Sequence, residues 1–298
     1  MIWLLFIILI LYIGADILYR RTARYKNKFE DMKKIKCYSN TNIDFINIGS
    51  TQARYAYEYL NVKGLNVATN EQSLEYSFLM LKKYLPYLNK GGKIIISVSD
   101  MDLLLSADLQ ERKYKYFGFL PIEKGGFVKN ILFPLFINPR EIIYIFKDES
   151  LYDKFEINKN ILNENDKFKD CERRVKRWKK YGVLSFDRDS GFVIDNKNDN
   201  INRNIEILKN IIEFCHKEGY CTVLVTPPVS PYFNYYFGNS FKDVLIKPLK
   251  ELSKSENIKY YDFTNDETFQ NEDLYLNTAC LNKNGRKVFM DVLVKTLI

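Results

Sequence analysis

The sequence predicts an α/β protein of three layers, a parallel sheet with helices on both faces, preceded by a transmembrane helix. Three observations predict this. The runs KIIISV at 93–98 and CTVLVT at 221–226 are continuously apolar, as strands buried on both faces of a parallel sheet are. Segments of helical periodicity alternate with these runs. An apolar stretch at the amino terminus is long enough to cross a bilayer.

The amino-terminal stretch 1–18 is apolar except for Asp16. As a helix it would be about 27 Å long, close to the thickness of the hydrocarbon layer. No basic region precedes it and no clear cleavage site follows, so we predict an anchor over 1–19 rather than a removable signal peptide. A basic juxtamembrane stalk follows at 20–40, and by the positive-inside rule its charges place the globular domain in the cytoplasm. Those charges are Arg20, Arg21, Arg24, Lys26 and Lys28.

The rest of the chain, 41–298, is interpreted as one α/β domain, because 298 residues with 46% apolar content can bury a full core. The formal net charge of +8 suits an anionic surface, such as phospholipid headgroups or a phosphate-containing polymer. The basic residues are scattered and match no nucleic-acid-binding motif, so no nucleic acid partner is expected. Five cysteines at irregular spacings indicate neither a disulfide scaffold nor a zinc site.

The first half of the domain begins with a β-rich run at 43–48 that ends in Gly49. A helix at 52–60 and a short strand at 65–68 follow. The next helix is predicted over 72–88, where apolar residues recur on one helical face, and Gly91-Gly92 is expected to end it before the strand at 93–98. Its apolar face comprises Leu74, Phe78, Leu81, Leu85 and Leu88.

The alternation resumes near residue 204. A helix at 204–217 ends before Gly219, the usual residue of a helix carboxyl end. The strand at 221–226 is stopped by Pro227-Pro228. A further strand at 259–263 and an amphipathic helix at 286–297 complete the sheet and its covering layers.

Between about 100 and 200 the alternation fails, and this segment is interpreted as a large insertion. It either lies over the carboxyl edge of the sheet, where ligand sites of open α/β folds form, or is a variable surface excursion with no site of its own.

Polar residues follow each of the first three predicted strands. Ser50 and Thr51 fall at the amino end of a helix, where backbone N–H groups can stabilise an oxyanion. After the second strand, Asn70 or Ser73 either lines the site or caps the next helix. Ser99, Asp100 and Asp102 follow the third strand. Paired carboxylates can bind a metal, but no second ligand cluster supports one, and a turn with solvated acids is the preferred interpretation.

Four stretches of the sequence resemble the SGNH, or GDSL-type, hydrolase superfamily, and more closely its DltD-like branch of cell-envelope polysaccharide clusters. The resemblance covers most of the chain after the anchor, although the insertion matches poorly. The stretches are NIGSTQARYAYEY, KGLNVATNEQSLEYSFLMLKKYLPYLNKGGKIII, VTPPVS and LNTACLNKNGRKVF.

The resemblance implies where the catalytic residues would stand. Aligning Gly49-Ser50-Thr51 with the family's Gly-Asp-Ser or Gly-Ser-Ser puts Thr51 at the nucleophile position. The family's Asp-x-x-His block corresponds to Asn277 and Cys280. The resemblance further implies oxyanion or substrate contacts in the loops that follow the strands, and neither a cofactor nor a metal. These contacts would involve Gly49, Asn70, Gln72, Ser73 and Ser99.

An inactive triad is the simpler interpretation of these substitutions. A hydroxyl attacks a carbonyl only when a neighbouring base takes its proton and a carboxylate supports that base. Neutral Asn277 cannot stabilise an imidazolium, and Cys280 is a poor base as a thiol or a nucleophile as a thiolate. The single histidine, His216, falls in the last turn of a predicted helix, where a surface or capping role is expected.

Three hypotheses remain open from the sequence. The first is envelope acyl transfer or deacylation by Thr51 or Ser50 with an unconventional base, and the resemblance implies a membrane-bound O-acyltransferase as partner. The second is a non-catalytic protein that binds an acyl or glycan ligand, or scaffolds such an acyltransferase. The third is chemistry at Cys280. Hydrolase relatives with this layout work outside the membrane, whereas the flanking charges predict the cytoplasm.

Overall fold

The chain divides into two compact units in a computed structural model, Met1–Ser39 with Asp108–Asp153 and Asn40–Ala107 with Lys154–Ile298. Each unit is described by itself. The structure describes residues 2–22, 25, 35, 38, 42–104, 116, 119–120, 139–146, 162–180, 183–187, 191–194 and 200–298.

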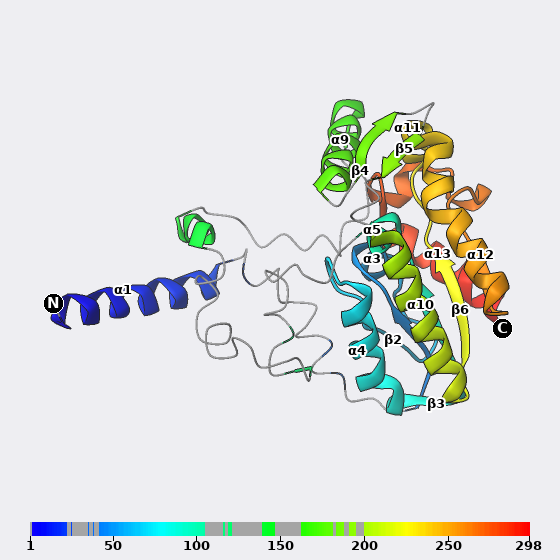
Figure 1. Cartoon of the computed structure of the whole chain (residues 1–298), viewed down its shortest axis with the longest axis horizontal. Coiled ribbons are helices and arrows are strands. Elements are labelled where there is room, and N and C mark those ends of the chain that lie inside the picture. Colours follow the sequence, from blue (N-terminus) through cyan, green and yellow to red (C-terminus); the bar gives the residue numbers. More distant parts are fainter. Residues whose placement is uncertain are drawn as a thin grey trace. The chain divides into compact units, whose positions relative to one another are not determined.

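The first unit contains helix α1 (Ile2–Arg21) and the short 3-10 helix η3 (Pro139–Ile145). The segment Trp3–Arg21 of α1 is long and apolar enough to cross a membrane, as predicted for the amino-terminal stretch. Figure 1 shows α1 at the amino terminus. The two helices contact each other. Most of the predicted stalk, including Arg24, Lys26 and Lys28, lies outside the described residues.

The second unit is built on a five-stranded sheet of order β2-β1-β3-β6-β7. Every neighbouring pair of strands is parallel, which confirms the predicted class. The strands are β1 (Ile43–Ile48), β2 (Gly64–Asn66), β3 (Leu88–Ser97), β6 (Cys221–Thr226) and β7 (Lys259–Asp262).

Helices cover both faces of this sheet (Figure 1). On one face α4 packs on β1, α10 on β6 and α12 on β7, while α3 and α13 pack together on the other face. A core of side chains from β1, β3 and β6 joins those of α3 and α13, among them Phe45, Ile95 and Phe289. These helices are α3 (Thr51–Ala56), α4 (Leu74–Tyr84), α10 (Asn200–Lys217), α12 (Lys247–Ser255) and α13 (Lys283–Leu297).

The predicted helix over 72–88 is wrong at its carboxyl end. Helix α4 ends at Tyr84, and a 3-10 turn, η1 (Leu85–Tyr87), leads directly into β3. Pro86 lies in that turn, and a proline cannot donate the backbone hydrogen bond that continues a helix. Gly91 therefore does not end the helix. It lies inside β3 with φ +84°, at an irregularity where the partners of β1 jump from Leu88 to Lys93.

The predicted insertion holds helix α9 (Glu164–Lys180) and an antiparallel pair, β4 (Val183–Asp187) and β5 (Gly191–Ile194). Helix α11 (Pro231–Phe241) packs against both α9 and β5. An aromatic cluster joins α9, β4 and α11, because the ring centroids of Trp178 and Phe237 lie 4.5 Å apart and those of Trp178 and Phe186 lie 5.8 Å apart. The tail adds the short antiparallel strands β8 (Tyr275–Asn277) and β9 (Cys280–Leu281).

Candidate functional site

The strand order places a switch point between β1 and β3. The chain runs from β1 outward to β2 and then returns to β3 on the other side of β1. Ligands of open parallel sheets bind at such a point, beyond the carboxyl ends of the strands. Here β1 ends at Gly49-Ser50-Thr51, and β3 ends before Ser99 and the short helix α5 (Asp100–Leu104).

Gly49 is required at the end of β1 by close packing. Its φ is +147°, and a Cβ built there would lie 2.7 Å from both the Ser97 carbonyl oxygen and the Ala53 Cβ. A residue with a side chain would therefore push β1 away from β3, or α3 away from the sheet. The glycine fixes the position of the Ser50-Thr51 turn relative to the end of β3.

Ser50 faces a buried carboxylate, Asp102, across the switch point. Asp102 Oδ2 accepts hydrogen bonds from the Ser99 backbone N at 2.7 Å and from the Ser99 hydroxyl at 2.6 Å. Burial raises the pKa of Asp102 to about 6, although the Ser99 and Ser50 hydroxyls lower it. Ser50 and Asp102 are each 2% exposed. The sequence-based interpretation of solvated acids is therefore wrong for Asp102, and also for Asp100, which is 1% exposed.

Thr51 begins α3, and its hydroxyl oxygen accepts a hydrogen bond from the Glu71 backbone N at 3.0 Å. This bond joins the turn after β1 to the loop after β2. In that loop Gln72 is fully buried, and its amide donates to the Val67 carbonyl and the Ser77 hydroxyl. Ser73 caps α4 by accepting from the Tyr76 backbone N. Thus Gln72 and Ser73 hold the loop and the start of the helix, and Asn70 lies in the same loop.

The tail segment lies beside the Ser50-Thr51 turn, as the resemblance implies. Strand β9 contacts α3, and Gln52 Nε2 donates to the Ala279 carbonyl at 2.9 Å. The Asn277 amide oxygen accepts from the backbone N of Ala279 and of Cys280, both at 3.0 Å. Asn277 therefore orients residue 280 by hydrogen bonds that need no charge.

The side chain at residue 280 is a buried thiol. Burial raises the pKa of Cys280 to about 11, against the lowering effect of the Arg174 charge and of the Asn277 hydrogen bond. Cys280 is 5% exposed and packs against Tyr55 and Leu276. With such a pKa the thiolate is on the order of one part in ten thousand at pH 7. At neutral pH the group is accordingly present almost entirely as the protonated thiol, which is a poor base.

His216 cannot substitute for the missing imidazole. It is exposed in the last turn of α10, and the next strand, β6, runs from there toward the switch point. The sequence-based expectation of a surface position agrees with this exposure. Position 280 is the position that the resemblance gives to the imidazole, and a thiol stands there.

Helix α9 is fastened onto the same edge of the sheet by Asp100. Both carboxylate oxygens of Asp100 bind Arg174, at 2.8 Å to Nε and 2.5 Å to Nη2. The Trp178 indole N–H donates to the same carboxylate at 2.6 Å. We call these three residues the α9 anchor. Its charges are paired, and the arginine also lies close enough to Cys280 to lower the pKa of that thiol.

A second contact joins α9 to the tail. Asp170 accepts from the Thr278 hydroxyl at 2.6 Å and from the Thr278 backbone N at 3.2 Å. The Thr278 carbonyl in turn accepts from the Ser230 backbone N at 3.0 Å. Helix α9 therefore covers the edge of the sheet at the candidate site. For this helix, the contacts favour the first of the two interpretations left open by the sequence.

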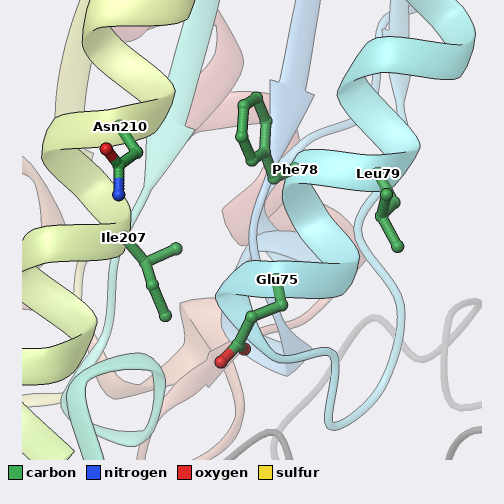
Figure 2. Close-up of a pocket in the computed structure, with 5 residues that line it drawn as sticks. All are labelled: Glu75, Phe78, Leu79, Ile207 and Asn210. Carbon is green, nitrogen blue, oxygen red and sulfur yellow. The ribbon is translucent and has the colours of Figure 1, made fainter.

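A cavity of about 520 Å³ opens elsewhere, between α4 and α10. Figure 2 shows that its lining comes from the outer helices and not from the strand ends. An ion pair between Glu75 and Arg203, 3.2 Å long, lies beside it. None of the candidate site residues takes part. The lining residues are Glu75, Phe78, Leu79, Ile207 and Asn210.

Comparisons with known proteins gave structural likenesses only. No family model matches the sequence, and no curated protein matches it. A Streptococcus pneumonia protein provisionally described as a platelet activating factor aligns with 92% of this chain and 94% of its own, at 10% identity and a TM-score of 0.47. A Bacteroides fragilis protein provisionally described as an acylhydrolase aligns with 89% and 92%, at 7% identity and a TM-score of 0.42. With TM-scores below 0.5, neither likeness assigns this chain to a family.

Sequence reasoning did not find the α9 anchor. The sequence places Asp100 after the third strand, but its partners Arg174 and Trp178 lie in the charged segment ENDKFKDCERRVKRWKK, whose pattern is that of a solvated helix. The one available signal is the tryptophan, because an indole in so polar a helix indicates a buried face. The metal hypothesis for Asp100 and Asp102 finds no support among the described residues, which contain no group of three or more potential ligands.

Proposed function

We propose that this chain is a membrane-anchored SGNH-like protein of cell-envelope polysaccharide or teichoic-acid assembly that binds or scaffolds and does not catalyse acyl transfer. The sequence resemblance supports the process. The single observation that carries the non-catalytic role is the buried Cys280 thiol, with a pKa of about 11, at the position where the resemblance expects an imidazole.

The reasons are chemical. Acyl transfer by Thr51 needs a base that takes the hydroxyl proton and later returns it to the leaving group. A protonated thiol cannot take that proton, and the neutral Asn277 amide cannot stabilise a positive charge on a base. The Thr51 oxygen also accepts the Glu71 N–H at 3.0 Å, which uses one of its two lone pairs for a structural bond. Threonine is moreover stiff at χ1, which crowds attack.

The retained shape supports a binding or scaffolding role. The hydrogen bond from Gln52 to the Ala279 carbonyl and the packing of β9 on α3 hold the tail beside the turn after β1 without catalytic groups. The bond from the Cys280 backbone N to Asn277 shapes the tail itself. The apolar helix α1 would hold the protein at a membrane, where a membrane-bound O-acyltransferase would be its partner. The net charge of +8 suits an anionic envelope polymer or glycan as ligand.

The test uses the full-length chain in lipid nanodiscs, treated with a fluorophosphonate probe and with p-nitrophenyl acetate. We expect neither labelling nor turnover above a protein-free control. The triple variant Thr51→Ser, Asn277→Asp, Cys280→His restores the three roles at the same positions, and we expect it to be labelled at position 51. Labelling of the natural chain that disappears in Thr51→Ala would contradict the proposal.

A second candidate function is hydrolysis by Ser50 with Asp102 as base, and one observation favours it. A carboxyl with a pKa of about 6 faces the Ser50 hydroxyl, and a base with a pKa near the working pH is effective. This function predicts that labelling in the same experiment rises with pH through about 6 and is lost in Ser50→Ala. The exposure of only 2% for both residues argues against it.

A further inference from the structure

The segment 139–146 in the first unit exposes large apolar side chains. Ile142 is 43% exposed, Ile143 is 51% exposed and Phe146 is 83% exposed. Ile143 and Phe146 are three residues apart, and in a 3-10 helix such residues lie on one face. The 3-10 helix η3 and the residue after it therefore present an apolar face that no other described residue covers.

The opposite face of η3 is fastened to the end of α1. The Glu141 carboxylate, 7% exposed, accepts a hydrogen bond from the Tyr19 hydroxyl at 3.0 Å. Tyr19 itself is only 2% exposed, and it stands in the last turn of the helix that is apolar enough to cross a membrane. The bond fixes the depth of η3 relative to α1.

For an α1 that spans the bilayer, that depth corresponds to the boundary between hydrocarbon and headgroups. Leu18, the residue before Tyr19, is 51% exposed and continues the apolar surface of α1. Arg20 and Arg21 follow Tyr19 in the last turn. Tyrosine and arginine at the end of a spanning helix are typical of the interface, where arginine meets lipid phosphates.

We propose that residues 142–146 form a second membrane contact, in which the apolar face of η3 inserts into the interface of the phospholipid bilayer beside the carboxyl end of α1. Short apolar faces rimmed by basic residues bind at this depth. Helix η3 contacts α1 and is hydrogen-bonded to its last turn through Tyr19 and Glu141. An apolar face held beside the end of a spanning helix lies next to the bilayer, which favours a bilayer over a protein as its occupant. The inference rests on the membrane anchor of the proposed function.

The test places the photocrosslinker p-benzoylphenylalanine at three aromatic positions of the full-length chain in phospholipid nanodiscs. Phe6 reports on α1, Phe146 on the proposed contact, and Tyr235, 63% exposed on α11 in the second unit, serves as the matched exposed control. Lipid adducts are counted by mass spectrometry. We expect adducts at Phe6 and Phe146, and several-fold fewer at Tyr235.

The outcomes separate the two proposals. Adducts at Phe6 but none at Phe146, or protein crosslinks in place of lipid adducts at Phe146, would overturn the second contact and leave the anchor intact. No adducts at Phe6 would overturn the anchor itself, and the second contact with it. A further variant, Tyr19→Phe, removes only the hydroxyl that holds Glu141. It should lower the adduct yield at Phe146 several-fold and leave the yield at Phe6 unchanged. If Tyr19→Phe left the yield at Phe146 the same as in the natural chain, this bond would not set the depth of η3.

Discussion

Two groups of side chains meet at the carboxyl edge of the sheet, and they differ in charge. The positions that the resemblance gives to a catalytic triad hold Thr51, Asn277 and Cys280, which are all neutral at pH 7. The α9 anchor holds an ion pair, Asp100 with Arg174, whose side chains are 2% and 14% exposed. The triad positions lack the charged groups that acyl transfer requires. The α9 anchor holds two buried charges that pair with each other.

The difference shows what each group is for. The Asn277 side chain accepts hydrogen bonds from the backbone N–H groups of Ala279 and Cys280, two and three residues later in the chain. These contacts are local, so we expect a substitution of Asn277 to be tolerated. Asp100 reaches Arg174, 74 residues away in the sequence, with two hydrogen bonds. Removing one partner of a buried ion pair leaves an uncompensated charge. Substitutions in the α9 anchor should therefore lower the free energy of unfolding far more than substitutions at the triad positions.

The largest expected effect is that of Arg174→Met, which keeps an apolar stem and removes the charge. We expect the free energy of unfolding to fall by about 3 to 5 kcal/mol, because the Asp100 carboxylate stays buried without its cation. Urea unfolding of the full-length chain in nanodiscs, followed by Trp178 fluorescence, measures this. The neighbouring Arg173→Ala is the matched control. Its side chain is 64% exposed, so we expect a change within about 0.5 kcal/mol. Equal effects of the two variants would contradict the assigned role of the anchor.

The next effect has the opposite sign and concerns Asp102. Its folded pKa, about 6, lies above the ordinary value of 3.8, so the folded state binds a proton more tightly than the unfolded state. Stability is therefore fully present below pH about 4, falls as the pH rises toward 6, and stays reduced above that.

Asp102→Asn removes the charge and keeps an oxygen for the Ser99 N–H and hydroxyl. We expect it to stabilise the protein at pH 7.5 by on the order of 2 kcal/mol, with no gain at pH 4. Unfolding midpoints at the two pH values measure the difference. A variant that is less stable than the natural chain at pH 7.5 would show that the Asp102 charge is used, which would favour a functional Ser50–Asp102 pair.

Strands β3 and β6 were predictable from sequence because each contains a short, continuously apolar run. The run CTVLVT matches β6 residue for residue, since Pro227-Pro228 follows it. The helix over 72–88 was predicted too long because Leu85 and Leu88 continue the apolar face of α4 in phase. Periodicity alone cannot distinguish that continuation from a 3-10 turn that leads into the next strand.

For the candidate site the sequence offers only short motifs, and the roles they suggest stay predictions. Thr51, Asn277 and Cys280 follow from the resemblance of short motifs, and the structure brings the turn and the tail together. The partners of Asp100 could not be predicted, because a pair separated by 74 residues leaves no local pattern. Burial, which sets the pKa of Asp102 and of Cys280, is likewise a property of the packed state.

The smallest effect is expected at the triad position itself. Cys280→Ser replaces a buried thiol by a hydroxyl of similar size that can still form a hydrogen bond with the Asn277 side chain, so the free energy of unfolding should change by about 1 kcal/mol or less. In the natural chain iodoacetamide should modify Cys221, which is exposed, well before Cys280, since a thiol with a pKa of about 11 is almost fully protonated. Rapid alkylation of Cys280 in the folded protein would reveal a reactive thiolate. In that case the triad position would be chemically reactive, and the contrast with the purely structural α9 anchor would lie in reactivity.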